Sequence, residues 1–273
     1  MMRYKVKDLR KLFIGVDKKI FLKGKGLVTE INFDNAATTP AFKQVMKSIL
    51  TTSSYYGSIA RGNGLKSQYS TELYEECKNY VLDYFNAPSS KYTTIFTTNT
   101  TEGLNRLSNV LINDKNDIVI CTRMEHHSND LPWRDKCNLK YVEVDGLGRL
   151  KLDQLEYLLD KYKDQVKYVT VTGASNVTGY VNDLKKIAKY THKYGAKLIV
   201  DGAQLVPHKN ISLLGNNENE NIDFLVFSGH KIYAPFGSGV IIGLKDYFEK
   251  NNPDYIGGGT VDLVLDNRVI YLD

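Results

Sequence analysis

Seven short apolar runs, separated by helical patterns, constrain the fold of this chain more than any other feature of its sequence. Each run has the length of a buried strand, and together they cover residues 93–97, 117–122, 140–144, 167–175, 197–203, 224–229 and 239–244. Strands that alternate with helices need crossover connections, which are typical of a parallel sheet with helices on both faces. Only the last two runs are too close for a helical crossover, so we expect residues 239–244 to run antiparallel to their neighbours. The sequence therefore predicts an α/β fold with a seven-stranded, mostly parallel sheet.

Two amphipathic helices are predicted between these runs from apolar residues that recur at helical spacing. The first covers residues 64–85 and places on one face Leu65, Tyr69, Leu73, Tyr80, Val81 and Tyr84. The second follows Thr101 and places Leu104, Leu107 and Leu111 together. The polar stretch 215–221 predicts a surface turn or insertion.

Composition narrows the class of protein. With 42% hydrophobic and 25% charged residues, the 273-residue chain has the composition of an ordinary globular protein. We expect a cytoplasmic protein that does not bind membranes, because the sequence has no apolar run of membrane-spanning length and no secretory signal. The net charge of +5 comes with no nucleic-acid-binding motif, so we expect no nucleic-acid partner. The three cysteines lack a CxxC spacing, which indicates neither disulfides nor a metal site.

Polar side chains follow five of the predicted strands. They are Thr100 and Thr101, His126 and His127, Asn176, Asp201 and Gln204, and finally Ser228, His230 and Lys231. Ligands of open parallel sheets bind beyond the carboxyl ends of the strands, where the connecting loops converge. A single lysine in a turn is usually no more than a surface residue. Five strands that bring polar groups to one edge of a sheet, however, predict a binding site.

The types of these residues indicate pyridoxal 5'-phosphate as the cofactor. Lys231 could form a Schiff base with its aldehyde, and the Asp201 carboxylate could keep the ring nitrogen protonated. Either His126 or His127 could stack on the ring and exchange protons. The helix that begins near Thr101 offers backbone N–H groups to a phosphate.

Seven sequence motifs resemble the successive signatures of the class V aminotransferase family, in its cysteine desulfurase (SufS-type) branch. They are DNAATT (34–39), ARGNG (60–64), NTTEG (99–103), MEHHSNDLPW (124–133), GASNVTGY (173–180), VDGAQ (200–204) and SGHK (228–231). The resemblance implies a fold-type I pyridoxal phosphate enzyme that works as a homodimer.

The resemblance also implies roles for particular residues. Lys231 would carry the cofactor as a Schiff base, His126 would stack on its ring and Asp201 would pair with its nitrogen. Asn176 and Gln204 would lie near the phenolic oxygen. The phosphate would be held by Thr100, Thr101, Ser228 and His230. Arg61 and Asn176 would bind the amino-acid substrate.

Relatives of this kind have a catalytic cysteine and a substrate-binding arginine in a C-terminal domain. We therefore expect an incomplete chain, with an N-terminal arm (1–30), a cofactor-binding domain (31–260) and a stub of that last domain (261–273). Its own cysteines are expected to be structural, with Cys77 on the inner face of a helix, Cys121 in a strand and Cys137 after the segment of Trp133.

The resemblance implies that the enzyme takes sulfur from L-cysteine and passes it to an acceptor protein. Two alternatives remain open at this stage. One is another reaction of the same family, such as transamination, elimination or epimerisation, because Ala60 replaces a histidine that desulfurases usually carry before the arginine. The other is a protein that binds the cofactor without turnover.

Overall fold

The computed structural model describes residues 6–60, 62–250, 255–257 and 259–271. The chain divides into two compact units, which we describe separately. Unit 1 combines Met1–Cys77 with Ser228–Ser238, and unit 2 combines Lys78–Phe227 with Gly239–Asp273. The domain division expected from the sequence has other boundaries and stays a prediction.

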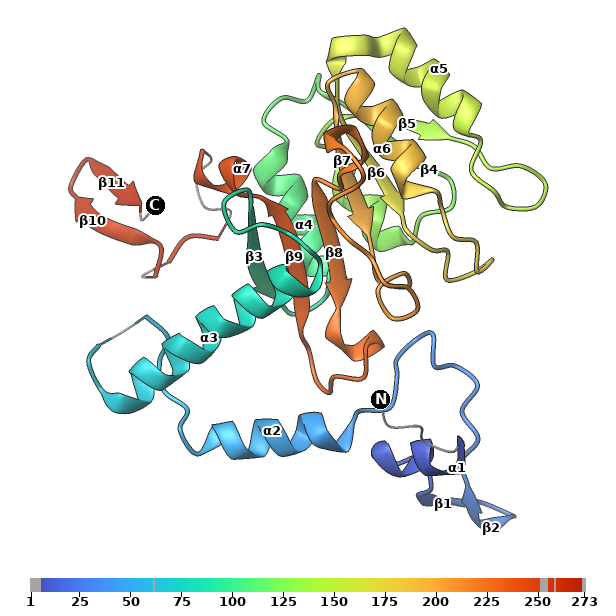
Figure 1. Ribbon diagram of the computed structural model, residues 1–273, viewed down its shortest axis with the longest axis vertical. Helices are drawn as coiled ribbons and strands as arrows, with labels where there is room; N and C mark the ends of the chain where they lie inside the picture. The colour runs from blue at the N-terminus through green and yellow to red at the C-terminus, as the bar shows by residue number, and fades with distance from the viewer. Residues whose placement is uncertain (1–5, 61, 251–254, 258, 272–273) are drawn as a thin grey trace. The chain divides into compact units, whose positions relative to one another are not determined.

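Unit 2 is built around a seven-stranded sheet (Figure 1). Its strands are β3 (Tyr92–Thr97), β4 (Ile118–Thr122), β5 (Asn138–Val142), β6 (Val166–Thr172), β7 (Lys197–Asp201), β8 (Phe224–Ser228, the last residue counted in unit 1) and β9 (Gly239–Leu244). Their order is β3-β9-β8-β7-β6-β4-β5. The pairs from β5 through β4, β6 and β7 to β8 are parallel, and β9 is antiparallel to β3. All seven predicted strands are confirmed, and so is the antiparallel direction of the last one against β3.

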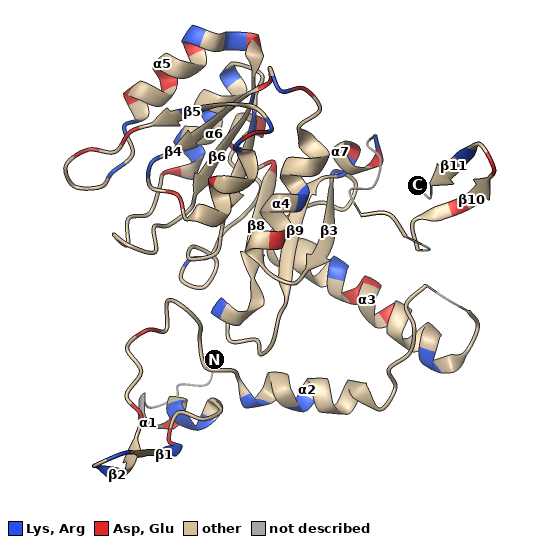
Figure 2. Ribbon diagram, turned by 180° about the vertical axis from the view of Figure 1, so that it is seen from behind, with Lys and Arg blue, Asp and Glu red and all other residues tan. Residues whose placement is uncertain are grey.

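The helices of unit 2 cover both faces of this sheet. They are α4 (Thr100–Leu111), α5 (Leu152–Tyr162), α6 (Leu184–Lys193) and the short α7 (Lys245–Glu249). The helices α5 and α6 pack together on one face, and α4 lies against β3 and β9 on the other (Figures 1 and 2). Short 3-10 turns complete unit 2: η2 (His127–Asn129), η3 (Leu131–Trp133), η4 (Lys163–Gln165) and η5 (Glu218–Glu220).

The core of unit 2 lies between these layers. Leu104 and Leu107 of α4 are fully buried, which confirms the apolar face predicted for this helix. Gly103 allows the helix to approach the sheet, because a Cβ atom at this position would lie 2.5 Å from Val226 Cγ1. In Figure 2 the strands of this sheet carry few charged residues, whereas α5 carries many.

A buried carboxylate joins α6 to the sheet. Asp223 is 3% exposed, and its Oδ2 accepts hydrogen bonds from the Leu198 backbone N–H at 2.8 Å and from His192 Nε2 at 2.6 Å. Lys197 Nζ lies 3.5 Å from Oδ1. The carboxylate therefore satisfies donors from the last turn of α6 and the first residues of β7.

Replacing Asp223 by alanine is expected to lower the free energy of unfolding by about 3 kcal/mol, because it leaves buried donors without an acceptor. Chemical denaturation followed by circular dichroism measures this change. Asp246→Ala is the matched control, since Asp246 forms an exposed ion pair with Lys250 and should change stability by less than about 1 kcal/mol. Equal losses in the two variants would contradict the role of Asp223.

Unit 1 contains shorter elements. They are α1 (Val6–Leu9), η1 (Arg10–Leu12), the hairpin of β1 (Lys19–Leu22) and β2 (Gly26–Thr29), α2 (Lys43–Ser53), the first part of α3 (Leu65–Tyr84) and η6 (Gly229–Lys231). A second hairpin belongs to unit 2 and consists of β10 (Val261–Leu265) and β11 (Arg268–Tyr271). No helix in the described residues is long and apolar enough to cross a membrane.

Two predicted segments lie where they were expected, and the structure adds how far each of them is buried. The helix predicted over residues 64–85 exists as α3, but its apolar face is open: Leu65 is 85% exposed and Tyr80 is 72% exposed. Helical spacing shows which residues share a face and not what covers it. The polar stretch 215–221 lies partly inside, because Glu220 is 6% exposed and forms an ion pair of 2.8 Å with Lys189 of α6.

Candidate functional site

The strand order of unit 2 reverses between β4 and β6. The chain adds β5 on one side of β4, and it adds β6, β7 and β8 on the other side. Such a reversal is where ligands bind in open parallel sheets, just beyond the carboxyl ends of the strands. Asp201 ends β7 and is 3% exposed, and its Oδ1 accepts the Ala203 N–H at 2.9 Å. In the register of the sheet it lies opposite Thr172, the last residue of β6.

The helix α4 begins beyond the carboxyl end of β3. The side chain of Asn99 caps the helix and accepts the Glu102 N–H at 2.9 Å. The Glu102 carboxylate accepts the backbone N–H and the hydroxyl of Thr98, and these hydrogen bonds together with Arg106 lower its pKa to about 2. Thr100 is buried and Thr101 is exposed. The two threonines thus begin a capped helix, as expected for a site that binds anions.

His126 is tied to this helix through Ser128. Its Nδ1 accepts the Ser128 N–H at 3.1 Å and lies 2.9 Å from Ser128 Oγ, which in turn lies 2.7 Å from Thr101 Oγ1. Because Nδ1 is an acceptor, the neutral imidazole carries its proton on Nε2. The ring of His127 lies 6.2 Å from that of His126. Of the two candidate histidines, His126 is the one that shares a hydrogen-bonded chain with α4.

Asn176 and Gln204 lie in the turns that follow β6 and β7. Asn176 is exposed and lies in a turn that Ser175 shapes. Ser175 Oγ accepts the backbone N–H groups of Val177 and Thr178, each at 3.2 Å. Gln204 is largely buried, at 9% exposure. Both residues therefore belong to loops at the carboxyl ends of the strands, as predicted.

Glu125, the residue before His126, was not predicted as part of the site. Its carboxyl group accepts hydrogen bonds from Thr122 Oγ1, from Asn129 Nδ2 at 2.6 Å and from the backbone N–H of Thr172. Burial raises the pKa of this group to about 8; the three hydrogen bonds oppose the rise and the negative charge of Asp201 adds to it. Glu125 lies within the motif MEHHSNDLPW (124–133). Its place in that motif was the one indication of a role that the sequence offered.

The lysine lies in unit 1, on the loop that follows β8. Ser228 is buried at the end of the strand, and Lys231 ends the 3-10 turn η6 and is partly exposed. Two threonines of the DNAATT motif hold this loop. The backbone oxygen of His230 accepts the Thr39 N–H at 2.9 Å, Thr39 Oγ1 at 3.0 Å and Thr38 Oγ1 at 3.1 Å. The motif at residues 34–39 therefore shapes the loop that presents Lys231.

The other side of the lysine loop is fixed by an aromatic cluster within unit 1. The rings of Phe42 and Tyr233 lie 4.8 Å apart, and Phe13 stacks on Phe42 at the same separation. Tyr233 adopts a left-handed backbone conformation with a φ of 67°, and its N–H donates to Thr39 Oγ1 at 2.8 Å. Burial, helped by the charge of Lys231, lowers the pKa of His230, which is therefore neutral at pH 7.

The predicted site residues thus fall into two groups. Unit 2 contains Thr100, Thr101, His126, Asn176, Asp201 and Gln204. Unit 1 contains Ser228, His230 and Lys231. Arg61 lies outside the described residues.

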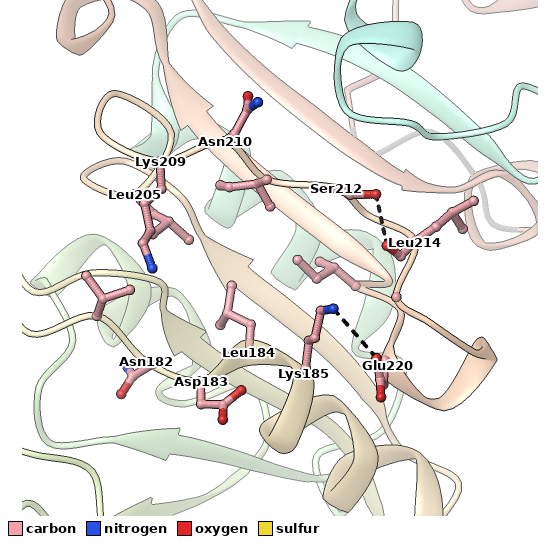
Figure 3. A pocket seen from close by; sticks show the side chains of 14 residues that line it. Asn182, Asp183, Leu184, Lys185, Leu205, Lys209, Asn210, Ser212, Leu214 and Glu220 are labelled. Carbon is pink, nitrogen blue, oxygen red and sulfur yellow. Dashed lines mark hydrogen bonds and ion pairs between the residues drawn. The ribbon is translucent and has the colours of Figure 1, made fainter.

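A separate hollow of about 470 Å³ lies beside the start of α6 in unit 2 (Figure 3). Lys185 and Glu220 face each other across it at 3.9 Å, and Ser212 Oγ donates to the backbone oxygen of Leu214 at 2.9 Å. None of the predicted site residues lines this hollow.

The three cysteines do not have the properties of a nucleophile. Cys121 is buried in β4, as expected, and burial raises its pKa well above the usual range. Burial also raises the pKa of Cys137 to about 11, and its thiol donates to the backbone oxygen of Trp133 at 3.2 Å. The expectation that Cys77 lies on an inner helix face was wrong, because this residue of α3 is exposed. Its pKa is raised by partial desolvation and by Glu76.

The sequence places this chain in a known family. Residues 31–271 match the model of the family described as Aminotransferase class-V. The chain belongs to this family.

Curated relatives and solved structures narrow the resemblance to one branch. The chain is 34% identical to a probable cysteine desulfurase of Borreliella burgdorferi, over 97% of this chain and 63% of that protein. It is 32% identical to a cysteine desulfurase of Wigglesworthia glossinidia brevipalpis, over 96% of this chain and 63% of that protein. It also resembles the apo structure of the cysteine desulfurase from Thermococcus onnurineus NA1, with a TM-score of 0.82 and 30% identity, over 100% of this chain and 65% of that one. The chain therefore spans less than two thirds of the length of these relatives.

Proposed function

We propose that this chain binds pyridoxal 5'-phosphate and takes part in the release of sulfur from L-cysteine. Its family and the names of its relatives support this proposal. The observation that carries it is the buried carboxylate of Asp201 at the carboxyl end of β7, next to the strand β6 that borders the strand reversal, at the same edge of the sheet as the chain of contacts from His126 through Ser128 to Thr101.

The residues of unit 2 fit this cofactor. A buried carboxylate can pair with a cationic group, and the protonated ring nitrogen of the cofactor is one. The N-terminal N–H groups of α4 and the hydroxyl of Thr101 suit a phosphate. When bound, the cofactor supplies an electron sink for the α-carbon of an amino acid. The protein contributes the binding, the orientation and the charge that make this possible.

In this proposal the side chains have distinct tasks. The amine of Lys231 attaches the cofactor, and Asp201 holds the proton on the ring nitrogen. His126 stacks on the ring, and its Nε2 is the nitrogen that can exchange a proton with the substrate, because Nδ1 is engaged by Ser128. The proposal requires that the loop after β8 reaches the same edge of the sheet at which β7 ends in Asp201.

The remaining residues receive supporting tasks. Thr100, Thr101, Ser228 and His230 would hold the phosphate, Asn176 and Gln204 would lie at the phenolic oxygen, and Arg61 and Asn176 would bind the substrate. The neutral state of His230 leaves one ring nitrogen as a hydrogen-bond donor and the other as an acceptor.

We also propose that the chain forms a homodimer in the cytoplasm and that a separate protein accepts the sulfur. Large apolar side chains are exposed in each unit, such as Phe33 in unit 1 at 96% and Val177 in unit 2 at 85%. A subunit interface would cover side chains of this kind.

The second candidate function is another reaction of the same family, or cofactor binding without turnover. Ala60 favours the other reactions, because it stands before Arg61 where desulfurases usually carry a histidine.

Product analysis separates these candidates. The purified chain is mixed with pyridoxal phosphate, L-cysteine and dithiothreitol, and equal amounts of alanine and sulfide above the background of the free cofactor would support the first candidate. The added dithiol accepts the sulfur, is oxidised to its cyclic disulfide and so releases sulfide. A keto acid or an inverted amino acid in place of alanine would support the second candidate. Sedimentation of the same sample measures whether the chain is a dimer.

A further inference from the structure

The hollow beside the start of α6 has an apolar floor and a rim that is open to solvent. Leu205 and Ile222 form the floor, and each is 3% exposed. Val181 and Leu214 stand at the rim, with exposures of 40% and 39%. A volume of about 470 Å³ is within the usual range for sites that bind small molecules. The hollow therefore has the size and the lining to take up the apolar body of a small ligand.

The wall of residues 210–215 is held in place by hydrogen bonds within the chain. The Ile222 N–H donates to the Leu213 oxygen at 2.8 Å. The Gly215 N–H donates to Asn221 Oδ1 at 2.9 Å. These bonds fix the wall without any contribution from a ligand, so a ligand would not have to order it on binding.

The charge of Lys185 is only weakly balanced by the carboxylate that faces it (Figure 3). Glu220 Oε2 lies 3.9 Å from Lys185 Nζ, whereas Glu220 Oε1 lies 2.8 Å from Nζ of Lys189, which does not line the hollow. Glu220 Oε2 also accepts the Asn216 N–H at 2.9 Å. The hydrogen bonds from Lys189 and Asn216 lower the pKa of Glu220, so this carboxylate is ionised and already paired at pH 7. The amine of Lys185 therefore keeps the capacity to bind a further anion.

Lys209 brings a second positive charge from another loop. It lies in the segment after β7, is exposed and forms no ion pair with any of the described residues. Figure 3 shows its amine directed toward the segment of Asn182, on the side of the hollow away from Glu220. Asp183 is engaged as the cap of α6, because its Oδ1 accepts the Lys186 N–H at 3.2 Å. Two amines thus face one apolar hollow whose carboxylates already have partners.

The hollow lies next to the proposed cofactor site. Leu205 follows Gln204 directly in the chain and packs on Gly173, where a Cβ atom would lie 2.5 Å from Leu205 Cδ2. The Gly173 N–H donates to the backbone oxygen of Asp201 at 2.8 Å. A ligand in the hollow would therefore be separated from the end of β7 by packed side chains.

We propose that this hollow is a second binding site, which takes a small organic anion with an apolar body. The apolar body lies on Leu205 and Ile222, and the anionic group accepts hydrogen bonds from the amines of Lys185 and Lys209. A neutral ligand gains nothing from the two ammonium groups, and an inorganic anion gains nothing from the apolar floor. The site is independent of the proposed function, because it lies outside the residues expected to hold the cofactor.

The first test maps binding on the chain without cofactor, with 4-phenylbutanoate as the probe. A ligand of this size is expected to bind with a Kd of about 1 mM. Titration should shift and saturate the backbone amide signals of Leu205, Leu214 and Ile222 in nitrogen-15 spectra. 4-Phenylbutan-1-ol has the same apolar body without the charge and should bind about tenfold more weakly. Equal affinity for the alcohol, or shifts centred outside the hollow, would overturn the proposal.

The two lysines are tested by substitution to methionine, which keeps an apolar stem and removes the charge. Lys185→Met combined with Lys209→Met should weaken binding of 4-phenylbutanoate about tenfold or more and leave binding of the alcohol unchanged. Both side chains are exposed, so the variant is expected to fold like the unaltered chain. Lys115→Met is the matched control, because Lys115 is exposed in the turn before β4, at the amino-terminal edge of the sheet. Undiminished binding of the anion by the double variant would refute the role of the lysines.

One equivalent of pyridoxal phosphate distinguishes the hollow from the proposed cofactor site. In its presence 4-phenylbutanoate should still shift the signals of Leu205, Leu214 and Ile222. Loss of these shifts would place the probe in the cofactor site and overturn the proposal. If the chain binds no cofactor, the proposed function fails, while the titration with the probe still decides whether the hollow binds an organic anion.

Discussion

Lys231→Ala is expected to abolish covalent attachment of pyridoxal phosphate to the chain. The lysine lies on a loop that Thr38 and Thr39 shape through the oxygen of His230, so another amine would not be presented in the same way. Turnover should fall by about 10²- to 10⁴-fold or more, the range for losing a positioned proton-transfer group, because Lys231 would also move protons. Borohydride treatment followed by peptide mass mapping measures the attachment directly.

Lys245→Ala is the control for this experiment. Lys245 follows β9 of the same sheet, is half-exposed and pairs with Glu249, so it matches Lys231 in type and in its place after a strand. Its variant should keep the adduct on the peptide of Lys231. An adduct of undiminished yield on another lysine in Lys231→Ala would show that the cofactor lysine is misassigned.

Asp201→Asn should have the second largest effect, a loss of about a hundredfold or more in turnover with the cofactor still bound. The amide keeps the shape of the side chain and the acceptor for the Ala203 N–H, but it removes a buried charge. Removing one partner of a buried ion pair costs several kcal/mol, and here the other partner would be the protonated ring nitrogen. Initial rates of product formation with L-cysteine measure the loss.

Asp117→Asn serves as its control, because Asp117 precedes β4 at the opposite, amino-terminal edge of the sheet. It should leave the rate nearly unchanged. Thermal unfolding of both variants without cofactor separates a loss of fold from a loss of charge. A rate for Asp201→Asn close to that of the unaltered chain would remove Asp201 from the site.

The sheet could be predicted because each of its strands is a short, largely apolar run, and most of these runs are followed by polar residues. Asp201 illustrates the point, since three buried apolar residues lead into it and the loop begins after it. The strand ends then predicted where Thr100, His126, Asn176 and Gln204 would lie. Parallel topology gathers these ends without any further information from the sequence.

Glu125 and the open face of α3 could not be predicted in the same way. The partners of Glu125 come from β4, β6 and η2, and only the folded chain shows that their donors converge on one carboxyl group. For α3, the spacing of Leu65 and Tyr80 was read correctly as a shared face, but burial depends on a second surface. The same gap explains Glu220, whose burial follows from its ion pair with Lys189.

The hydrogen bonds from Thr38 and Thr39 to the backbone oxygen of His230 also bear on the order of folding. Thr39 and His230 are 191 residues apart in the chain, so their contact closes one of the longest loops in the molecule. Contacts of such high sequence separation form slowly, because the entropy of loop closure must be overcome before the contact contributes any stability. During synthesis Thr38 and Thr39 emerge long before the loop that they hold. We therefore expect the loop of Lys231 to take its final conformation late in folding. Until most of the chain is folded, the amine of Lys231 is not held in the position in which it would react.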